Sequence, residues 1–527
     1  MKKSNLKKFL SAAAVLAISA TAALSAISIA GCASDKDSAY DGNEKLITAD
    51  ANHRSDVIST ALGTVTNRSS GRKYYVAPNG VNTNDGLSWD TPIDFTTILL
   101  REENPLQPGD TVYVKPGTYN IQSGIVVPGT VKGEYNKYIR IVNAYYEKEE
   151  SGYNGSEKIC TLDFSDQSFD STSRGVEMTG DYIYWYGIDI CGAGDNGLYI
   201  GGSYNTIEFS EFYNNRDTGL QLGRSDSGKN SFEQWPSYNL IKNCTSHNNY
   251  DNETYGENAD GFAAKLTVGY GNVFDGCIAY RNSDDGWDLY AKTDSGNIGC
   301  VIIYNCVAFE NGYLEYTQRE CNALFSKWTG TYSEDPENPL GANSYFTRDG
   351  DGNGFKLGGS VMEGDVQLYN CLAFYNRMHG VTDNSNPGYL YIDGVTSVDN
   401  SAVVDDNPAS PTFGQIIRTE NKDTHNNIDV SRQTYSYNTV KKTISVNSDI
   451  SVSAGADRYR GSVTDSILSN GSDSAKANYI EGSIDADTKN VGGIAFTSQK
   501  PALSAENVFE KIAVDVSSSV TGEGETA

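Results

Sequence analysis

The pattern that decides the fold is written twice, as NADGFAAK at residues 258–265 and as DDGWD at residues 284–288. Each copy has an aspartate directly before a glycine and an aromatic residue directly after it. A third copy, NGFK at residues 353–356, puts Lys356 at the position that Asp288 holds in the second copy. One turn written three times indicates a repeated supersecondary unit.

The repeat extends over most of the chain as a set of fixed positions. Seven segments share an anchor position, which holds Cys191, Ser210, Cys244, Cys277, Cys306, Cys371 and Val395 in turn. Five residues after each anchor stands an asparagine: Asn196, Asn215, Asn249, Asn282, Asn311, Asn376 and Asn400. An apolar residue lies three positions before each anchor. The pattern predicts an all-β parallel solenoid whose coils lie about 4.8 Å apart around an apolar interior.

The asparagines and cysteines of this repeat have structural interpretations. A stacked asparagine can bond through its side-chain amide to the asparagines above and below. Five of the nine cysteines fall at the anchor position, where they are expected to form a reduced, buried column rather than a disulfide scaffold or a zinc site.

The two ends of the chain differ in composition from the repeat. Residues 1–32 have a lysine-rich start, an apolar run and a final Cys32, which resembles a bacterial lipobox and implies a lipid on that cysteine. Residues 33–72 are polar and are interpreted as a flexible tether. Residues 73–470 are assigned to the solenoid, and residues 471–527 to a Ser/Gly-rich, partly disordered segment.

The first coil of the solenoid needs a cover, because an open end would be an exposed sheet edge. Residues 96–102 are a candidate capping helix at the N-terminal end. Lys73 to Tyr119, where short strands alternate with turns, is similar to the start of right-handed parallel β-helix proteins of carbohydrate metabolism. The expected fold is therefore a right-handed parallel β-helix.

The formal net charge is −27, which argues against a nucleic-acid partner. It would also repel a polyanionic substrate unless a metal ion or a basic patch intervenes. After the N-terminal run no second apolar span of roughly 20 residues occurs, so membrane contact is expected only through the lipid on Cys32. The protein is expected to be a monomer anchored at the bacterial cell surface, or secreted.

Stacking of the glycine turns predicts an acidic site on one outward face. It brings Asp260 near Asp285 and Asp288 near Lys356, with Asp284 alongside. Clustered carboxylates need a counter-ion, and hard oxygen ligands select Ca²⁺. Favoured Asp-Gly turn chemistry explains two of these aspartates singly, but not all four together. The run DGDGNG at residues 349–354 matches the start of an EF-hand loop, yet has Ser360 at its twelfth position and is interpreted as a turn.

These motifs resemble those of family 9 of the polysaccharide lyases, the calcium-dependent pectate lyases, over residues 73–400. The resemblance implies that the calcium ligands are Asp260, Asp284, Asp285 and Asp288, and that the catalytic base is Lys356. It also implies a plant cell-wall pectate substrate, an α-1,4-linked galacturonate chain, cleaved by β-elimination to a 4,5-unsaturated end. An insertion between Asn311 and Gly354 contains Trp328, Tyr332 and Tyr345, which are candidates for sugar stacking.

Several alternatives stay open. Lys265 is a rival base, but it lies four residues after its glycine rather than two and is expected to point elsewhere. Candidates to hold neighbouring carboxylates are Arg281, Arg348 and Arg377. A lyase acting on another uronic-acid polymer such as a rhamnogalacturonan, a polygalacturonase-type hydrolase, or a non-catalytic carbohydrate-binding surface protein would suit the same solenoid.

Overall fold

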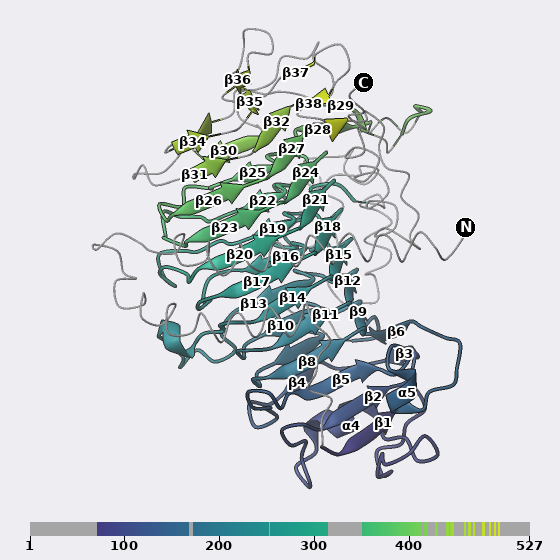
Figure 1. Ribbon diagram of the computed structural model, residues 1–527. Coiled ribbons are helices and arrows are strands. Elements are labelled where there is room, and N and C mark those ends of the chain that lie inside the picture. Colours follow the sequence, from purple (N-terminus) through teal and green to yellow (C-terminus); the bar gives the residue numbers. More distant parts are fainter. Residues whose placement is uncertain are drawn as a thin grey trace, which may run out of the picture.

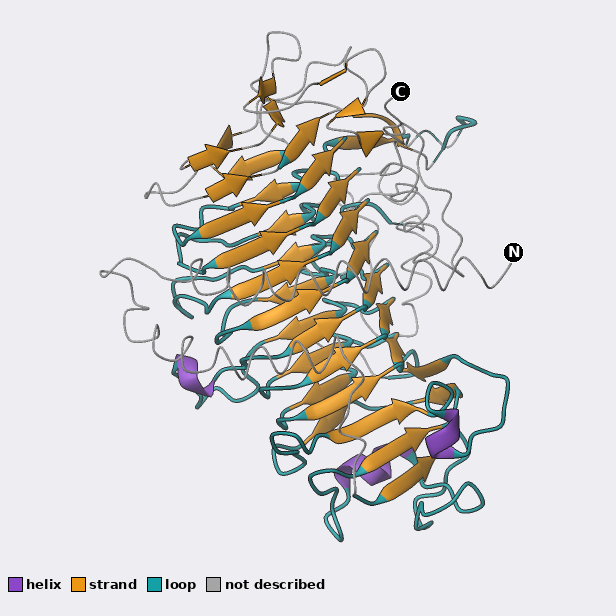
Figure 2. Cartoon of the chain, viewed as in Figure 1, coloured by secondary structure: helices purple, strands orange, loops and turns teal. Residues whose placement is uncertain are grey.

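The computed structural model describes residues 71–167, 172–251, 253–314 and 350–405, and short segments between residues 407 and 495. Three parallel sheets wind around one apolar core, and a complete coil contributes one strand to each sheet (Figures 1 and 2). The predicted right-handed parallel β-helix is confirmed.

We call the sheets A, B and C in the order in which a coil visits them. Sheet A contains, in spatial order, β1 (Lys73–Val76), β2 (Thr111–Val114), β5 (Ile139–Asn143), β8 (Ile183–Tyr186), β11 (Thr206–Glu208), β14 (Leu240–Lys242), β17 (Asn272–Asp275), β20 (Val301–Tyr304), β23 (Val366–Tyr369), β26 (Leu390–Asp393), β31 (Thr439–Lys441) and β34 (Ser462–Thr464). Sheet B contains β3 (Gly117–Asn120), β6 (Cys160–Asp163), β9 (Asp189–Cys191), β12 (Glu211–Tyr213), β15 (Thr245–His247), β18 (Ile278–Tyr280), β21 (Val307–Phe309), β24 (Leu372–Phe374), β27 (Thr396–Val398), β32 (Ile444–Val446), β35 (Ile467–Ser469) and the antiparallel β36 (Ala477–Tyr479).

Sheet C carries the candidate site. It contains β4 (Ile125–Val127), β7 (Val176–Met178), β10 (Leu198–Ile200), β13 (Leu220–Leu222), β16 (Phe262–Ala264), β19 (Trp287–Asp288), β22 (Phe355–Lys356), β25 (Val381–Thr382), β30 (Ile428–Val430) and β33 (Arg458–Tyr459). Smaller antiparallel groups are formed by β28 (Ala402–Val404) with β29 (Ile416–Thr419), and by β37 (Ile484–Asp485), β38 (Asn490–Val491) and β39 (Ile494–Ala495). The described helices are α4 (Phe95–Leu100), α5 (Lys148–Ser151) and the 3₁₀ turn η1 (Phe232–Gln234).

The core is held in register by stacked aromatic rings. Phe262, Trp287 and Phe355 begin successive strands of sheet C, and their ring centroids lie 5.0 and 4.8 Å apart. All three side chains are fully buried. Burying one such ring stabilises the fold by roughly 1.5–3 kcal/mol, and the ring-to-ring contacts add to this. The residues that precede and follow these rings are therefore aligned along the solenoid.

The predicted asparagine ladder is present at one corner of the coils. Each Nδ2 donates to the Oδ1 of the next asparagine at 2.8–3.0 Å, along Asn215, Asn249, Asn282, Asn311, Asn376, Asn400 and Asn427. Asn427 extends the ladder one coil beyond the prediction. The bend comes from the residue before each asparagine, for example Arg281 with a φ of 51° and Glu310 with a φ of 53°.

The first coil of the predicted repeat was placed wrongly by three residues. Phe212 pairs with Ile190, so Ile188 rather than Cys191 aligns with Ser210. The ladder position of that coil is held by Ala193, whose N–H donates to Asn215 Oδ1 at 3.1 Å. Asn196 instead lies beside its glycine and donates to Gln221. The sequence separation from the next glycine identifies the ladder position of this coil. Asn215, Asn282 and Asn376 each precede their glycine by four residues, as Ala193 does.

The cysteine column is correspondingly shorter. Its members Cys244, Cys277, Cys306 and Cys371 are buried and free, as predicted. Cys191 is also free and buried but lies outside the column, opposite Tyr213. Cys300, away from the column, is disulfide-bonded.

A short helix lies near the first coils, close to the predicted range. In α4 the Asp94 carboxylate accepts a hydrogen bond from Thr97 N at 2.8 Å, which caps the helix start. Phe95, Ile98 and Leu99 are buried in the main core. That this helix caps the solenoid stays a prediction.

Other predictions fall on residues that the structure does not describe. These are residues 1–32 with Cys32, almost all of residues 33–72, Arg348, the insertion aromatics Trp328, Tyr332 and Tyr345, and most of residues 471–527. The proposed domain boundaries stay predictions. Within the described part of the chain, no helix combines the length and apolar character needed to cross a membrane.

We expect the asparagine ladder to contribute measurably to stability. Asn282 Nδ2 donates to Asn311 Oδ1 at 3.0 Å, and its Oδ1 accepts from Asn249 Nδ2 at 2.8 Å. Asn282→Ala should lower the free energy of unfolding by about 1–3 kcal/mol, because buried polar groups lose their partners. Chemical denaturation measures the loss. The matched control is Asn120→Ala at an exposed end of β3, and an equal effect of both changes would contradict the ladder's role.

A buried carboxylate beside sheet A predicts a pH-dependent stability. Burial raises the pKa of Asp365 to about 6, although its hydrogen bond from Tyr389 N opposes the shift. The unfolded chain has an aspartate pKa of about 3.9, so the folded state holds the extra proton. This contribution to stability is complete below about pH 4 and is lost as the pH rises through 6.

Asp365→Asn keeps an oxygen for Tyr389 N and removes the titration. The stability of this variant relative to wild type should therefore rise by up to about 3 kcal/mol between pH 4 and pH 7. Denaturant unfolding at both pH values measures this difference. Asp294→Asn, in an exposed loop, is the control. A pH-independent difference for Asp365→Asn would refute the assignment.

Candidate active site

Close packing of successive coils explains the glycine of each turn. A Cβ on Gly261 would lie 2.8 Å from Gly286 O, and one on Gly286 would lie 2.6 Å from Gly354 O. Both distances are shorter than real Cβ contacts. The glycines are therefore required by the approach of the neighbouring coil, and the residues before them form a second vertical column.

In that column each side chain caps the next coil. Asp260 Oδ1 accepts from Asp285 N at 3.2 Å, and Asp285 Oδ1 accepts from Asn353 N at 2.7 Å. Asn353 Oδ1 in turn accepts from His379 N at 3.2 Å. One oxygen of each aspartate thus accepts a hydrogen bond from the backbone of the next coil rather than from its own turn, and the Oδ2 atoms remain for the site.

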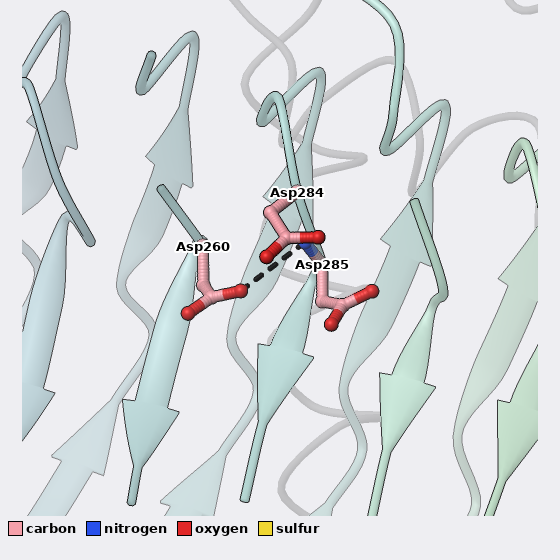
Figure 3. Close-up of side chains that lie close together, drawn as sticks. All are labelled: Asp260, Asp284 and Asp285. Carbon is pink, nitrogen blue, oxygen red and sulfur yellow. Dashed lines mark hydrogen bonds between the residues drawn. The ribbon is translucent and has the colours of Figure 1, made fainter. Parts of the chain in front are cut away.

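Three buried carboxylates converge here: Asp260 and Asp285 of the column and the adjacent Asp284 (Figure 3). One oxygen each from Asp260, Asp284 and Asp285 lies within 4.8 Å of the other two. Asp284 is held by Asn258 N at 3.0 Å and by Asp351 N at 2.7 Å. Both hydrogen bonds come from backbone donors on other segments, so the orientation of this carboxylate depends on loop docking.

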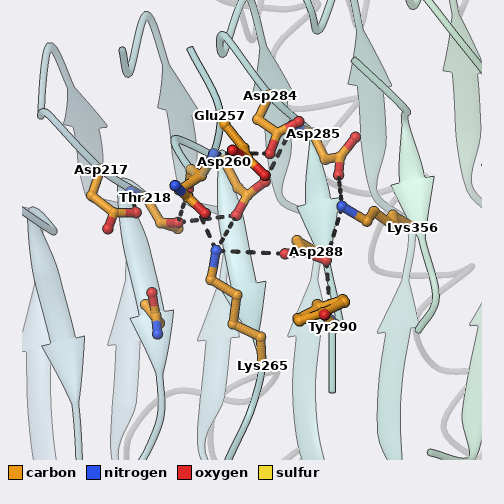
Figure 4. Close-up of polar contacts among 12 residues, drawn as sticks. Asp217, Thr218, Glu257, Asp260, Lys265, Asp284, Asp285, Asp288, Tyr290 and Lys356 are labelled. Atoms are coloured by element: carbon orange, nitrogen blue, oxygen red, sulfur yellow. Dashed lines mark hydrogen bonds and ion pairs between the residues drawn. The ribbon is translucent and has the colours of Figure 1, made fainter. Parts of the chain in front are cut away.

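Asp288 and Lys356 are direct neighbours on sheet C, as the register predicted. Lys356 Nζ lies 2.9 Å from Asp285 Oδ2 and 3.7 Å from Asp288 Oδ1 (Figure 4). Burial opposes the charge on this ammonium, but the surrounding carboxylates, first Asp285, outweigh burial and raise the pKa of Lys356 well above its usual range. In this state Lys356 is a cation that offsets part of the negative charge of the cluster.

The expectation that Lys265 points elsewhere is wrong. Its Nζ lies 2.7 Å from Asp260 Oδ2 and 3.5 Å from Asp288 Oδ2, inside the site. Side chains two and four residues after a glycine have the same parity, so both project from the same face of a strand. The alternation of side chains along β16 was the signal that sequence reasoning overlooked.

The EF-hand-like run also contributes to the site, although as a loop. The Asp351 N–H anchors Asp284, and Asp351 Oδ2 lies 3.7 Å from Lys356 Nζ. Gly350 packs against Ser283 O, where an added Cβ would lie at 1.9 Å. The position of this run, directly before the third glycine turn, could have indicated the contact.

Two of the three arginine candidates, Arg281 and Arg377, lie in the described part of the chain. Arg281 Nε pairs with Glu310 at 2.7 Å, and Arg377 donates to Gly350 O at 2.9 Å. Arg281 therefore pairs with a carboxylate outside the cluster, and Arg377 supports the loop that carries Asp351. The nearby His379 pairs with a carboxylate outside the cluster, since its Nε2 lies 3.9 Å from Asp429 Oδ2.

Burial makes the ionised forms of these carboxylates unfavourable unless further cations are present. It is the first cause of raised pKa values for Asp260, Asp284 and Asp285, to which neighbouring aspartates add. Lys356 and Lys265 act in the opposite direction. Asp285 Oδ2 is buried and accepts no hydrogen bond, so its only described partner is the Lys356 ammonium.

The donor set fits a calcium ion. Oxygens that share one Ca²⁺ at about 2.4 Å must lie within about 4.8 Å of one another. The oxygens of Asp260, Asp284 and Asp285 meet this limit. Asp285 Oδ2 is buried and accepts no hydrogen bond, so a cation is the partner that suits it. Carboxylates without thiolate or imidazole favour Ca²⁺ over zinc or copper.

Fold and site together define a right-handed parallel β-helix protein with a carboxylate-and-lysine centre on one outer sheet. The profile of the Pel9A-like right-handed β-helix region matches residues 74–427. The chain therefore belongs to the Pel9A-like family.

Known relatives and structures agree with this assignment. "Pectate lyase L" of Paenibacillus polymyxa is 45% identical over 326 residues, covering 62% of this chain and 63% of the relative. "Pectate lyase L" of Dickeya chrysanthemi is 33% identical over 338 residues, covering 63% and 65%. The matched part thus spans less than two thirds of these relatives. The crystal structure of pectate lyase Pel9A superposes with a TM-score of 0.50 at 26% identity, covering 84% of this chain and 91% of that chain.

Proposed function

We propose that this protein is a pectate lyase that cleaves α-1,4-linked polygalacturonate by β-elimination. The observation that carries the proposal is the ion pair between Lys356 and Asp285 within a cluster of buried carboxylates. The names of the relatives support the reaction class and the substrate.

Asp260, Asp284, Asp285 and Asp288 would hold the metal. A calcium ion bound there would neutralise the substrate's C6 carboxylate and so acidify the C5 proton. The chain's own contribution is to keep these carboxylates apart from bulk water and fixed by backbone donors, for example Asp284 by Asp351 N. The positive charge of a bound cation would also offset the repulsion between a protein of net charge −27 and a polyanion.

Lys356 is proposed to be the base. In its neutral form it takes the C5 proton, the C5–H electron pair becomes the C4–C5 double bond, and the C4–O bond breaks with its electrons on the leaving sugar. Of the four carboxylates that raise the pKa of Lys356, all but Asp351 are proposed metal ligands. A bound cation would add positive charge beside these oxygens, whereas loss of the lysine proton removes positive charge there. Cation binding and deprotonation of Lys356 should therefore favour each other.

The proposal predicts a specific loss in Lys356→Ala. This variant should produce unsaturated ends from polygalacturonate at least about 100-fold more slowly, because general-base catalysis contributes roughly 10²–10⁴-fold. Ultraviolet absorbance of the new double bond measures the rate, with calcium and with chelator. Wild-type activity should require calcium and should increase at alkaline pH.

Lys356→Arg is the matched control, because it keeps a cation beside Asp285 but cannot act as a base near neutral pH. It should be as inactive as Lys356→Ala. Calcium binding should persist in both variants. Rapid elimination by either variant would refute the base, and chain shortening without absorbance would indicate a hydrolase instead.

We also propose that Cys32 carries a lipid that anchors the protein at the bacterial cell surface. The support is the lysine-rich start, the apolar run and the cysteine at residue 32. Cys32→Ser should abolish incorporation of a labelled fatty acid and shift the protein from the detergent phase to the aqueous phase. Unchanged labelling of Cys32→Ser would refute this proposal.

A further inference from the structure

The ammonium group of Lys265 is surrounded by oxygen atoms of neighbouring residues. Its Nζ lies 2.7 Å from Asp260 Oδ2, 3.4 Å from Asn258 O and 3.5 Å from Asp288 Oδ2. The Thr218 hydroxyl oxygen lies 3.1 Å from both Asp260 Oδ2 and Asn258 O. Carboxylate, carbonyl and hydroxyl oxygens are the ligands of a hard metal cation, so an ammonium fills what would otherwise be a cation site.

The two lysines of the site stand on opposite sides of one strand. Lys265 follows β16 and Lys356 ends β22, while Asp288 on β19 lies between them and faces both (Figure 4). Lys356 must lose its proton in the proposed elimination. The proposed elimination gives Lys265 no part in that transfer, and its contacts are with Asp260 and Asp288, two proposed metal ligands, and with Asn258 O.

We propose that Lys265 is a tethered cation that takes the place of a second divalent ion, so that the carboxylate cluster binds one calcium ion rather than two. This inference rests on the proposed calcium site. It makes Lys265 a positioning residue, which fixes Asp260 and Asp288 from the side opposite Lys356.

The charges explain why such a residue is needed. Asp260, Asp284, Asp285 and Asp288 carry four negative charges when ionised, and one Ca²⁺ balances two of them. When Lys356 is neutral, Lys265 is the remaining cation among the described residues that pairs with members of this cluster, namely Asp260 and Asp288. A buried carboxylate that loses its partner is strongly destabilising, so a vacated position should recruit another cation.

Two variants of Lys265 separate the effect of the ammonium charge from the effect of side-chain volume. Lys265→Ala removes the ammonium and opens its position, whereas Lys265→Met removes the charge but keeps most of the volume. Equilibrium calcium titration with elemental analysis should show one more bound calcium per chain in Lys265→Ala than in wild type. It should show no gain in Lys265→Met. Ions bound elsewhere cancel, because only differences between variants are compared.

Thermal unfolding provides a second readout. Without calcium both variants should melt below wild type, and millimolar calcium should restore Lys265→Ala but not Lys265→Met. Lys132→Ala, at an exposed site, should match wild type in both measurements.

The outcomes distinguish this inference from the proposed function. A wild-type protein that binds no calcium would refute the proposed metal site itself. A wild-type protein that binds calcium, with an unchanged number of ions in Lys265→Ala, would refute only the tethered cation. If Lys265→Ala folds only with calcium and binds the extra ion, the inference is supported. Failure to fold in calcium, while Lys265→Met folds, would overturn it.

Discussion

The structure depends on parallel strands that stack in constant register from coil to coil. Backbone hydrogen bonds set the spacing, and the asparagine ladder and the ring column of sheet C prevent slippage. A slip of one residue would turn Asp288 and Lys356 away from the outer face. Because the register survives the long insertion between Asn311 and Gly354, residues far apart in sequence meet with the accuracy of strand pairing.

The site reuses atoms that the fold already needs. Asp260 and Asp285 each use Oδ1 to cap the following coil, and this bond orients Oδ2 toward a lysine. These two carboxylates are thus oriented by hydrogen bonds that also join successive coils. The cost is a concentration of buried negative charge, which two ammonium groups offset in this structure.

Most of the fold could be predicted because a solenoid repeats its signals. The ladder from Asn215 to Asn400 and the buried cysteines from Cys244 to Cys371 follow from fixed spacing alone. The first coil failed because its ladder position holds Ala193, and a nearby Asn196 satisfied the pattern by chance. A match of residue type alone selects Asn196 over Ala193, whereas the number of residues to the following glycine identifies Ala193.

The sequence by itself determined the winding, the side of the solenoid that carries the carboxylates, and the meeting of four aspartates with Lys356. These results follow from periodicity, because equivalent positions in a stack must coincide. Only the tertiary structure decided that Lys265 reaches Asp260 and that the Asp351 backbone holds Asp284. Such contacts depend on where a long side chain extends and how a loop docks, and neither is repeated along the chain.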